Sequence, residues 1–107
     1  MISKDTIDKV FEFSRVEEVI SDFIALKKTG ANFKGLSPFT NEKTPSFVVS
    51  PSKQIWKDFS SGKGGNVIAF LMEHEQFNYP ESIKYLANKY NIEILETAES
   101  AENAEER

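Results

Sequence analysis

The stretch that decides the fold is GANFKGLSPFTNEKTPSFVVSPSKQIWKDFSSGKGGN, which covers residues 30–66. It contains two short turn-like segments, Ser37–Thr40 and Asp58–Ser61, separated by residues 41–57. Metal-binding turns are commonly placed in this way on neighbouring hairpins. The chain has no cysteine, however, and its single histidine, His74, lies outside both segments. The stretch therefore has the spacing of a metal-binding module without the residues that usually bind the metal.

The composition is that of one domain with a modest core, because 39% of the 107 residues are apolar and 12% are aromatic. We expect this domain to be part of a larger protein. The lack of cysteine excludes disulfides and thiolate metal sites. No apolar run reaches the roughly 18 residues of a transmembrane helix, and Met1–Lys4 does not open a signal peptide. We therefore expect a cytoplasmic protein with no membrane partner.

The net charge of −4 hides a segregation of charge along the chain. Residues 27–65 contain only Glu42 and Asp58 as acids, whereas residues 1–26 and 66–107 are acidic on balance. The bases of the central segment are Lys27, Lys28, Lys34, Lys43, Lys53, Lys57 and Lys63. A basic segment between acidic flanks indicates a patch that faces a polyanion. A solvated lysine surface without a partner would give the same charge pattern.

Two short helices are expected before the central stretch. Ser3 can cap the first helix, which would bury one side of residues 7–11. The segment Ser14–Glu17 has the form of a capping box, in which Glu17 reaches back toward the cap, and it predicts the start of a second helix. The second helix would bury Val16, Val19 and Ile20 at helical spacing.

Strands are expected through the central stretch. Residues 23–27 should become extended, and Thr29–Gly30 supplies a turn before a strand over residues 32–36. Residues 46–50 and 54–58 predict two further strands that are joined as a hairpin. The glycine-rich residues that follow predict a flexible corner.

Helical patterns return after the central stretch. A helix should begin near Asn66, and Asn78–Glu81 combines a capping asparagine, a proline and a glutamate at the start of another. Asn91 can end that helix in a left-handed conformation, before a short strand over residues 92–95. Residues 96–107 are acidic and almost free of aliphatic residues, which predicts a flexible tail or a linker to an absent catalytic domain. The predicted fold class is α+β, with a small antiparallel sheet flanked by helices over residues 1–95.

The string EKTPSF, residues 42–47, lies in a specific setting of glycine, proline, lysine and aromatic residues. The matching positions are Gly30, Asn32, Phe33, Gly35, Leu36, Pro38, Phe39, Val49, Pro51, Lys53, Trp56, Phe59, Gly62, Gly64 and Gly65. With these residues the chain resembles the N-terminal zinc-binding domain of bacterial DNA primases of the DnaG type. The resemblance covers residues 1–95 and implies a zinc-ribbon-like sheet.

The four zinc ligands of that family, in the order Cys, His, Cys, Cys, fall on Ser37, Thr40, Asp58 and Ser61. Hydroxyls are poor zinc ligands, and one carboxylate cannot replace thiolates and an imidazole. We therefore expect no zinc and no other cofactor, since the same oxygens would bind Mg²⁺ only weakly.

A hydrogen-bond cluster is the expected replacement for the metal. In it Asp58 would accept from Ser37, Thr40, Ser61 or nearby backbone amides. Aromatic side chains would cover the cluster, namely Phe39, Trp56 and Phe59. The alternative is a set of four exposed polar residues with no connection to one another.

The resemblance implies binding of single-stranded template DNA and assistance to RNA primer synthesis, with a primase RNA-polymerase domain and the replication machinery as partners. Basic groups can follow the phosphate backbone while exposed aromatic rings stack on bases. The candidate DNA-binding residues are Lys34, Lys43, Lys53, Lys57, Lys63 and Trp56. Alternation along the strand leaves Trp56 open to a core role as well. A core role is also expected for Phe47 and Phe59.

No catalytic residue is expected in this chain, although the parent protein would be a DNA primase, a nucleotidyltransferase. Residues 61–65 do not match a phosphate-binding loop, and His74 is expected to be a surface residue. The sequence also shows no carboxylate cluster for two-metal nucleotidyl transfer. Two alternatives stay open: a protein-interaction module that docks on the primase catalytic domain, and a primase-like DNA-binding module of a mobile element.

Overall fold

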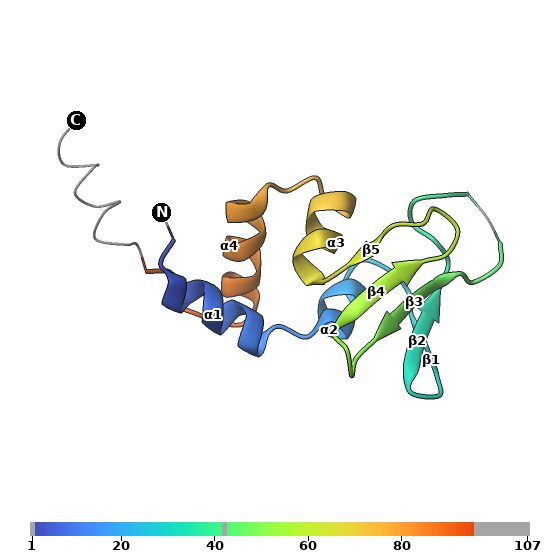
Figure 1. Cartoon of the computed structure of the whole chain (residues 1–107), viewed down its shortest axis with the longest axis horizontal. Helices are drawn as coiled ribbons and strands as arrows, with labels where there is room; N and C mark the ends of the chain where they lie inside the picture. Colours follow the sequence, from blue (N-terminus) through green and yellow to red (C-terminus); the bar gives the residue numbers. More distant parts are fainter. Residues whose placement is uncertain (1, 42, 96–107) are drawn as a thin grey trace. The chain divides into compact units, whose positions relative to one another are not determined.

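The computed structural model describes residues 2–41 and 43–95 (Figure 1). The chain forms two compact units. Among the described residues, 15–41 and 43–77 form the sheet unit, and 2–14 together with 78–95 form the helical unit. In the described part of the chain, no helix has the length and apolarity that crossing a membrane requires.

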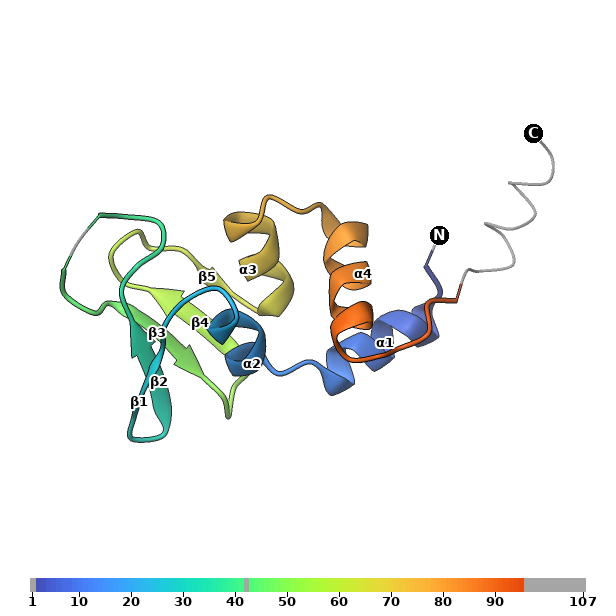
Figure 2. The same ribbon diagram turned by 180° about the vertical axis from the view of Figure 1, so that it is seen from behind.

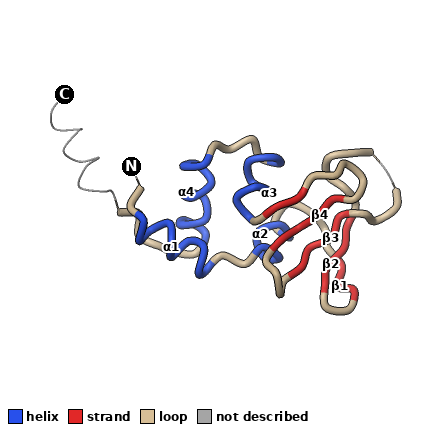
Figure 3. Tube along the Cα trace, in the orientation of Figure 1, coloured by secondary structure: helices blue, strands red, loops and turns tan. Residues whose placement is uncertain are grey.

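The sheet unit is built on a five-stranded antiparallel sheet in which every strand pairs with the next one along the chain (Figure 3). Its strands are β1 (Lys27–Thr29), β2 (Asn32–Gly35), β3 (Phe47–Ser50), β4 (Ile55–Asp58) and β5 (Gly64–Gly65). Gly30 makes the tight turn between β1 and β2 at a φ of 64°, a conformation that glycine adopts without strain. The predicted α+β class with a small antiparallel sheet is therefore confirmed.

The strands differ from the predictions at their ends. The three predicted strands of the central stretch are present, each slightly shorter than expected. Residues 23–26 are not in a strand, and β1 begins at Lys27. Of the three glycines expected to form a flexible corner, Gly64 and Gly65 instead supply β5, where a side chain on Gly64 would meet the Trp56 carbonyl oxygen at 2.9 Å. A strand of two glycines has no side-chain pattern, so the sequence did not indicate it.

Two helices, α2 (Val16–Ser21) and α3 (Val67–His74), belong to the sheet unit (Figure 2). Helix α3 begins next to Asn66, as predicted, and the Asn66 side chain caps it by accepting from Ala69 N at 2.9 Å. The capping box predicted for α2 is wrong, because Arg15 is the N-cap and makes no side-chain cap bond. The Val16 amide donates instead to the side-chain oxygen of Gln54 at 2.9 Å, so a residue distant in sequence satisfies this helix end.

The core of the sheet unit lies on the side of the sheet that carries Phe47, Val49, Trp56 and Asp58, here called the inner face. Helices α2 and α3 contact the sheet, α2 at β3 and α3 at β4 and β5. The Phe47 and Trp56 rings stack with centroids 5.4 Å apart, and Phe70 of α3 meets Trp56 edge-on at 5.8 Å. Aromatic contacts of this kind stabilise a small core beyond the area that they bury.

The helical unit contains α1 (Lys4–Phe13) and α4 (Tyr79–Lys89), which pack together. The caps at Ser3 and at Asn78, with its capping box to Glu81, are confirmed. Asn91 has the predicted left-handed conformation, with a φ of 57°.

The last described residues of the helical unit differ from the prediction, since residues 92–95 form no strand. Leu95 bonds to the start of α1 instead, with its carbonyl accepting from Ser3 N at 2.8 Å and its amide donating to Thr6 Oγ1 at 3.0 Å. The predicted tail over residues 96–107 lies outside the described residues.

Candidate functional site

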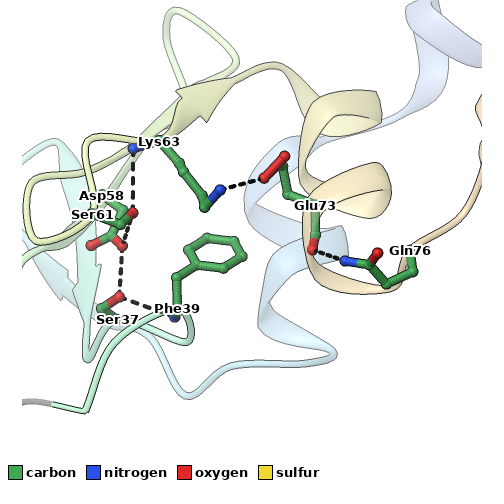
Figure 4. A network of polar contacts seen from close by, with 7 residues as sticks. All are labelled: Ser37, Phe39, Asp58, Ser61, Lys63, Glu73 and Gln76. Carbon is green, nitrogen blue, oxygen red and sulfur yellow. Dashed lines mark hydrogen bonds and ion pairs between the residues drawn. The ribbon is translucent and has the colours of Figure 1, made fainter.

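The two turn segments singled out in the sequence meet at the buried carboxylate of Asp58 (Figure 4). Ser37 Oγ donates to Asp58 Oδ2 at 2.6 Å, and Ser61 Oγ donates to the same oxygen at 2.7 Å. The other oxygen, Oδ1, accepts from the backbone N–H of Ser60 at 3.3 Å. Asp58 has no exposed surface, so these donors take the place of water around its charge. The expected cluster around Asp58 is present, and we call Ser37, Asp58 and Ser61 the Asp58 cluster.

Thr40 joins this arrangement indirectly. Its backbone N–H donates to Ser37 Oγ at 3.2 Å, while its hydroxyl bonds to Ser60 Oγ at 2.7 Å. The structure thus pairs the Thr40 hydroxyl with the second turn and not with Asp58 itself. Two side-chain bonds, Ser37 to Asp58 and Thr40 to Ser60, now link the two turns.

The pKa of Asp58 is lowered from its ordinary value by the balance of two effects. Burial acts to raise this pKa, because it removes water from the charged form. Hydrogen bonds from Ser37, Ser61 and the backbone N–H groups of Ser60 and Ser61 favour the charged form and together outweigh burial. Asp58 is therefore ionised at neutral pH, and its charge is held by donors from both turns.

The expected aromatic cover of the Asp58 cluster is only partly present. Phe39 is half-buried and packs on Trp56 with ring centroids 5.7 Å apart. Phe59 is 67% exposed, so the predictions that it covers Asp58 and lies in the core are wrong. Phe59 follows the end of β4, where its backbone N–H bonds to the Ser46 carbonyl oxygen at 2.9 Å and its side chain faces solvent.

Lys63 stands on the same side of the sheet as the Asp58 cluster (Figure 4). Its ammonium pairs with Glu73 of α3 at 2.8 Å and lies 5.8 Å from the centre of the Phe39 ring. Its backbone N–H donates to Ser61 Oγ at 3.3 Å. Lys63 therefore connects the second turn to α3.

The donor set at the four turn positions does not fit zinc. Ser37, Thr40 and Ser61 offer neutral hydroxyls, and Asp58 offers one carboxylate whose oxygens already accept hydrogen bonds. Structural zinc sites use thiolate and imidazole ligands in a closed tetrahedron. Within residues 2–41 and 43–95, no three histidine, cysteine, aspartate or glutamate side chains come together as a metal site.

His74 is not the surface residue that the sequence predicted. Its side chain is 24% exposed, and its ring stacks on Phe70 with centroids 5.0 Å apart. The Nδ1 atom lies 2.8 Å from the carboxylate of Glu75. The neighbouring glutamates suggested a solvated helix face, whereas Phe23 and Phe39, from other parts of the sheet unit, also lie beside the His74 ring.

The opposite side of the sheet, here called the outer face, carries a row of lysines. The strand register places Lys27 opposite Lys34, Lys34 opposite Val48, and Val48 opposite Lys57. These four residues therefore lie on one line across four neighbouring strands. Neighbouring strands are about 4.8 Å apart. The three lysines are exposed, and we call them the lysine row.

A hollow of about 340 Å³ lies on the outer face next to the lysine row. Lys53, in the turn between β3 and β4, and Lys57 line it. Exposed apolar side chains, Ile55 and Phe59, and polar ones, Asn32 and Ser50, also line it. The outer face thus combines cationic groups, an exposed aromatic ring and hydrogen-bonding groups.

The structure separates the predicted DNA-binding lysines into three groups. Lys34, Lys53 and Lys57 lie together on the outer face. Lys43 is exposed in the loop between β2 and β3, and Lys63 is paired with Glu73 on the other side of the sheet.

Trp56 requires a correction, because it is 1% exposed and its Nε1 donates to the Asn66 carbonyl oxygen at 2.8 Å. A ring buried in this way cannot stack on a base. The sequence reasoning also missed Lys27 as a site residue, although its charge was counted, because its place in the row depends on the pairing of β1 with β2.

Comparisons with known proteins place the chain in a family. A profile described as the CHC2 zinc finger matches residues 2–102. A DNA primase of Clostridium acetobutylicum is 48% identical over 94 residues, and one of Listeria monocytogenes is 45% identical over 93 residues. These matches cover 88% and 87% of the chain but 16% and 15% of the two primases, so the chain spans less than a fifth of their length.

A solved structure agrees with these relatives. The crystal structure of the Aquifex aeolicus primase, with its zinc-binding and RNA polymerase domains, is similar with a TM-score of 0.78 and 38% identity. The similarity covers 88% of the chain and 23% of that structure. The chain therefore belongs to the CHC2 zinc-finger family of bacterial DNA primases, as a member that has no cysteine.

Proposed function

We propose that the sheet unit binds single-stranded template DNA with its outer face, as the N-terminal template-binding part of a bacterial DNA primase. The observation that carries this proposal is the lysine row of Lys27, Lys34 and Lys57 across neighbouring strands. Cations on one line can follow successive phosphates of a nucleic-acid backbone and release its counterions. The overall negative charge of the chain does not oppose this, because the acids lie mainly outside the central segment.

The exposed aromatic ring on this face supplies the second requirement of single-strand binding. Phe59 is 67% exposed at the edge of the hollow that also holds Lys53 and Lys57. A base can stack on such a ring whatever its identity, because every base has a π-face. Phe59 thus takes the role that the sequence had assigned to Trp56.

Primer synthesis itself requires groups that the described part of this chain does not bring together. Nucleotidyl transfer uses two metal ions held by carboxylates, and residues 2–41 and 43–95 contain no such cluster. We infer that an RNA-polymerase domain supplies the chemistry in the cytoplasm, and that the sheet unit presents the template to it as part of the replication machinery. This division of labour agrees with the two domains named for the Aquifex aeolicus structure.

Fluorescence anisotropy with a labelled oligonucleotide of about 16 nucleotides tests the proposal, since single-strand sites span that order of length. We expect affinity to fall with salt, and we expect Lys34→Ala and Lys57→Ala each to reduce the salt slope by about 0.7. Lys84→Ala, at an exposed position of α4, is the control and should leave binding unchanged. An absence of binding at low salt, or an equal loss with Lys84→Ala, would contradict the proposal.

The second candidate function of the outer face is binding to a protein partner, because exposed lysines can also contact an acidic protein. Capture of a separate primase RNA-polymerase domain by a chain without DNA affinity would favour that reading. Loss of the capture in Lys34→Ala would then place the contact on the outer face.

A further inference from the structure

We propose that the Asp58 carboxylate holds the two turns of the sheet unit together in place of a metal ion, so that this chain folds without zinc and without reduced thiols. The chain belongs to a zinc-finger family, yet the side chains at its two turns are hydroxyls and one carboxylate, which do not fit zinc. This inference concerns folding and does not depend on the proposed DNA binding.

One oxygen atom collects donors from both turns. Asp58 Oδ2 accepts from Ser37, which is 21 residues away in sequence, and from Ser61 in its own turn. Bonds of 2.6 and 2.7 Å between hydroxyls and a carboxylate are short and charge-assisted. One carboxylate oxygen thus joins the two turns through Ser37 and Ser61, as a metal ion joins the residues that bind it, while the Thr40 hydroxyl bonds to Ser60 instead.

The formal charge of the site is the same in the two arrangements. Three thiolates and a neutral imidazole around Zn²⁺ give a net charge of −1. The Asp58 cluster has one ionised carboxylate and two neutral hydroxyls, which is also −1. The replacement therefore does not change the formal charge near neighbouring groups such as the Lys63 ammonium.

Further contacts tighten the first turn around the cluster. Ser37 Oγ accepts from the Phe39 and Thr40 backbone N–H groups at 3.1 and 3.2 Å while it donates to Asp58. Phe39 then packs on Trp56, and the Lys63 ammonium lies over its ring while it pairs with Glu73. Hydrogen bonds stabilise less than a structural zinc does, so the first turn depends on this packing as well.

The first experiment measures metal content and metal dependence of the whole chain. Protein produced in zinc-supplemented medium is analysed for metals and melted with and without a chelator and a thiol oxidant. We expect far less than one zinc per chain and the same Tm in all conditions. About one zinc per chain, or a Tm that falls with chelator, would overturn the proposal.

The second experiment removes the central charge. Asp58→Asn keeps the shape of the side chain, and we expect its Tm to fall by about 10 °C because two hydrogen bonds lose their charge assistance and an amide NH2 group replaces one acceptor oxygen. Asp5→Asn is the matched control, at an exposed aspartate of α1, and should shift Tm by only a few degrees. An Asp58→Asn protein with the same Tm as the Asp5→Asn control would overturn the proposal. The metal analysis of the parent chain stays decisive if the Asn variant does not fold.

The third experiment restores a metal site at the same four positions. A variant with Ser37→Cys, Thr40→His, Asp58→Cys and Ser61→Cys should bind one zinc per chain and should lose its structure on chelation. This outcome would show that the Asp58 cluster occupies the place of a metal. A variant that binds no zinc would overturn that equivalence.

Discussion

The two faces of the sheet differ in what their polar groups contact. On the inner face, the charge of Asp58 is buried and each of its oxygens accepts a hydrogen bond from the protein. On the outer face, Lys27, Lys34 and Lys57 are exposed, although the Lys57 ammonium also donates to the Gly62 carbonyl oxygen at 3.1 Å. Polar groups satisfied within the fold stabilise it, whereas exposed cations on one line are available to an external anion. Changes on the inner face should therefore alter stability, and changes on the outer face should alter binding.

Within the first turn segment, two hydroxyl side chains also differ in what they contact. The first segment carries two hydroxyl side chains, yet Ser37 is buried in the Asp58 cluster while the Thr40 hydroxyl bonds to Ser60 near the surface. Spacing alone did not distinguish these roles. The difference arises because Asp58 projects from β4 into the core, where Ser37 can reach it and the Thr40 side chain does not.

The largest expected effect comes from Trp56→Ala on the inner face. The ring is 1% exposed and stacks on Phe47, so its removal should lower the free energy of unfolding by about 3–5 kcal/mol. Denaturant unfolding followed by circular dichroism measures this change. The neighbour Ile55→Ala, at a 42% exposed position of the outer face, should cost less than about 1 kcal/mol. Similar losses for the two variants would break the distinction between the faces.

Acid should weaken the inner face through Asp58. The folded pKa of Asp58 lies below its ordinary value, so its contribution to stability is complete above the ordinary carboxyl pKa of about 4 and is lost as pH falls through the folded pKa. The stability of the parent chain should therefore decline below about pH 4 more steeply than that of Asp58→Asn. Unfolding free energies measured from about pH 7 to pH 2 give the two curves.

Glu17 provides the background for that measurement. Burial acts to raise its pKa, but hydrogen bonds from its own backbone N–H, Gln54 and Arg15 and the charge of Arg15 lower the pKa overall. It should therefore contribute an acid-dependent loss to both proteins. Parallel curves for the parent chain and Asp58→Asn would mean that Glu17 and other carboxylates account for the acid sensitivity.

Phe59→Ala should separate binding from stability on the outer face. Loss of a stacking ring should weaken single-stranded DNA binding by about 1–3 kcal/mol. The 67% exposed side chain should contribute within about 0.5 kcal/mol to stability. Anisotropy titration and thermal melting of the same preparation give both values. A large fall in Tm with unchanged affinity would assign Phe59 to packing.

The smallest effects are expected from single lysines, and two of them sharpen the comparison of faces. Lys27→Ala should reduce the salt slope of DNA binding by about 0.7, because Lys27 belongs to the lysine row. Lys63→Ala should leave this slope nearly unchanged and cost at most about 1 kcal/mol of stability, since its partly exposed ion pair with Glu73 is screened by solvent. Equal slopes for the two variants would place the DNA path outside the outer face.

Local sequence patterns predicted much of the fold. The predicted side-chain caps at Ser3 and Asn78 marked two helix starts correctly, because each cap bonds to a backbone N–H within three residues. The failed capping box at Ser14 involves a bond from Val16 to Gln54, which no local pattern reveals. The alternation of β4 predicted that Trp56 and Asp58 share a face, and that pair is buried.

The sequence by itself determined the elements, the basic character of the central segment, and the absence of thiolate and imidazole ligands from the two turns. These properties depend on residue type and on spacing within a few positions. Only the tertiary structure decided that Ser37 and Ser61 bond to one oxygen of Asp58, that Trp56 is buried while Phe59 is exposed, and that Lys27 joins Lys34 and Lys57. The physical reason is that strand register and the packing of α3 bring together residues far apart in the chain.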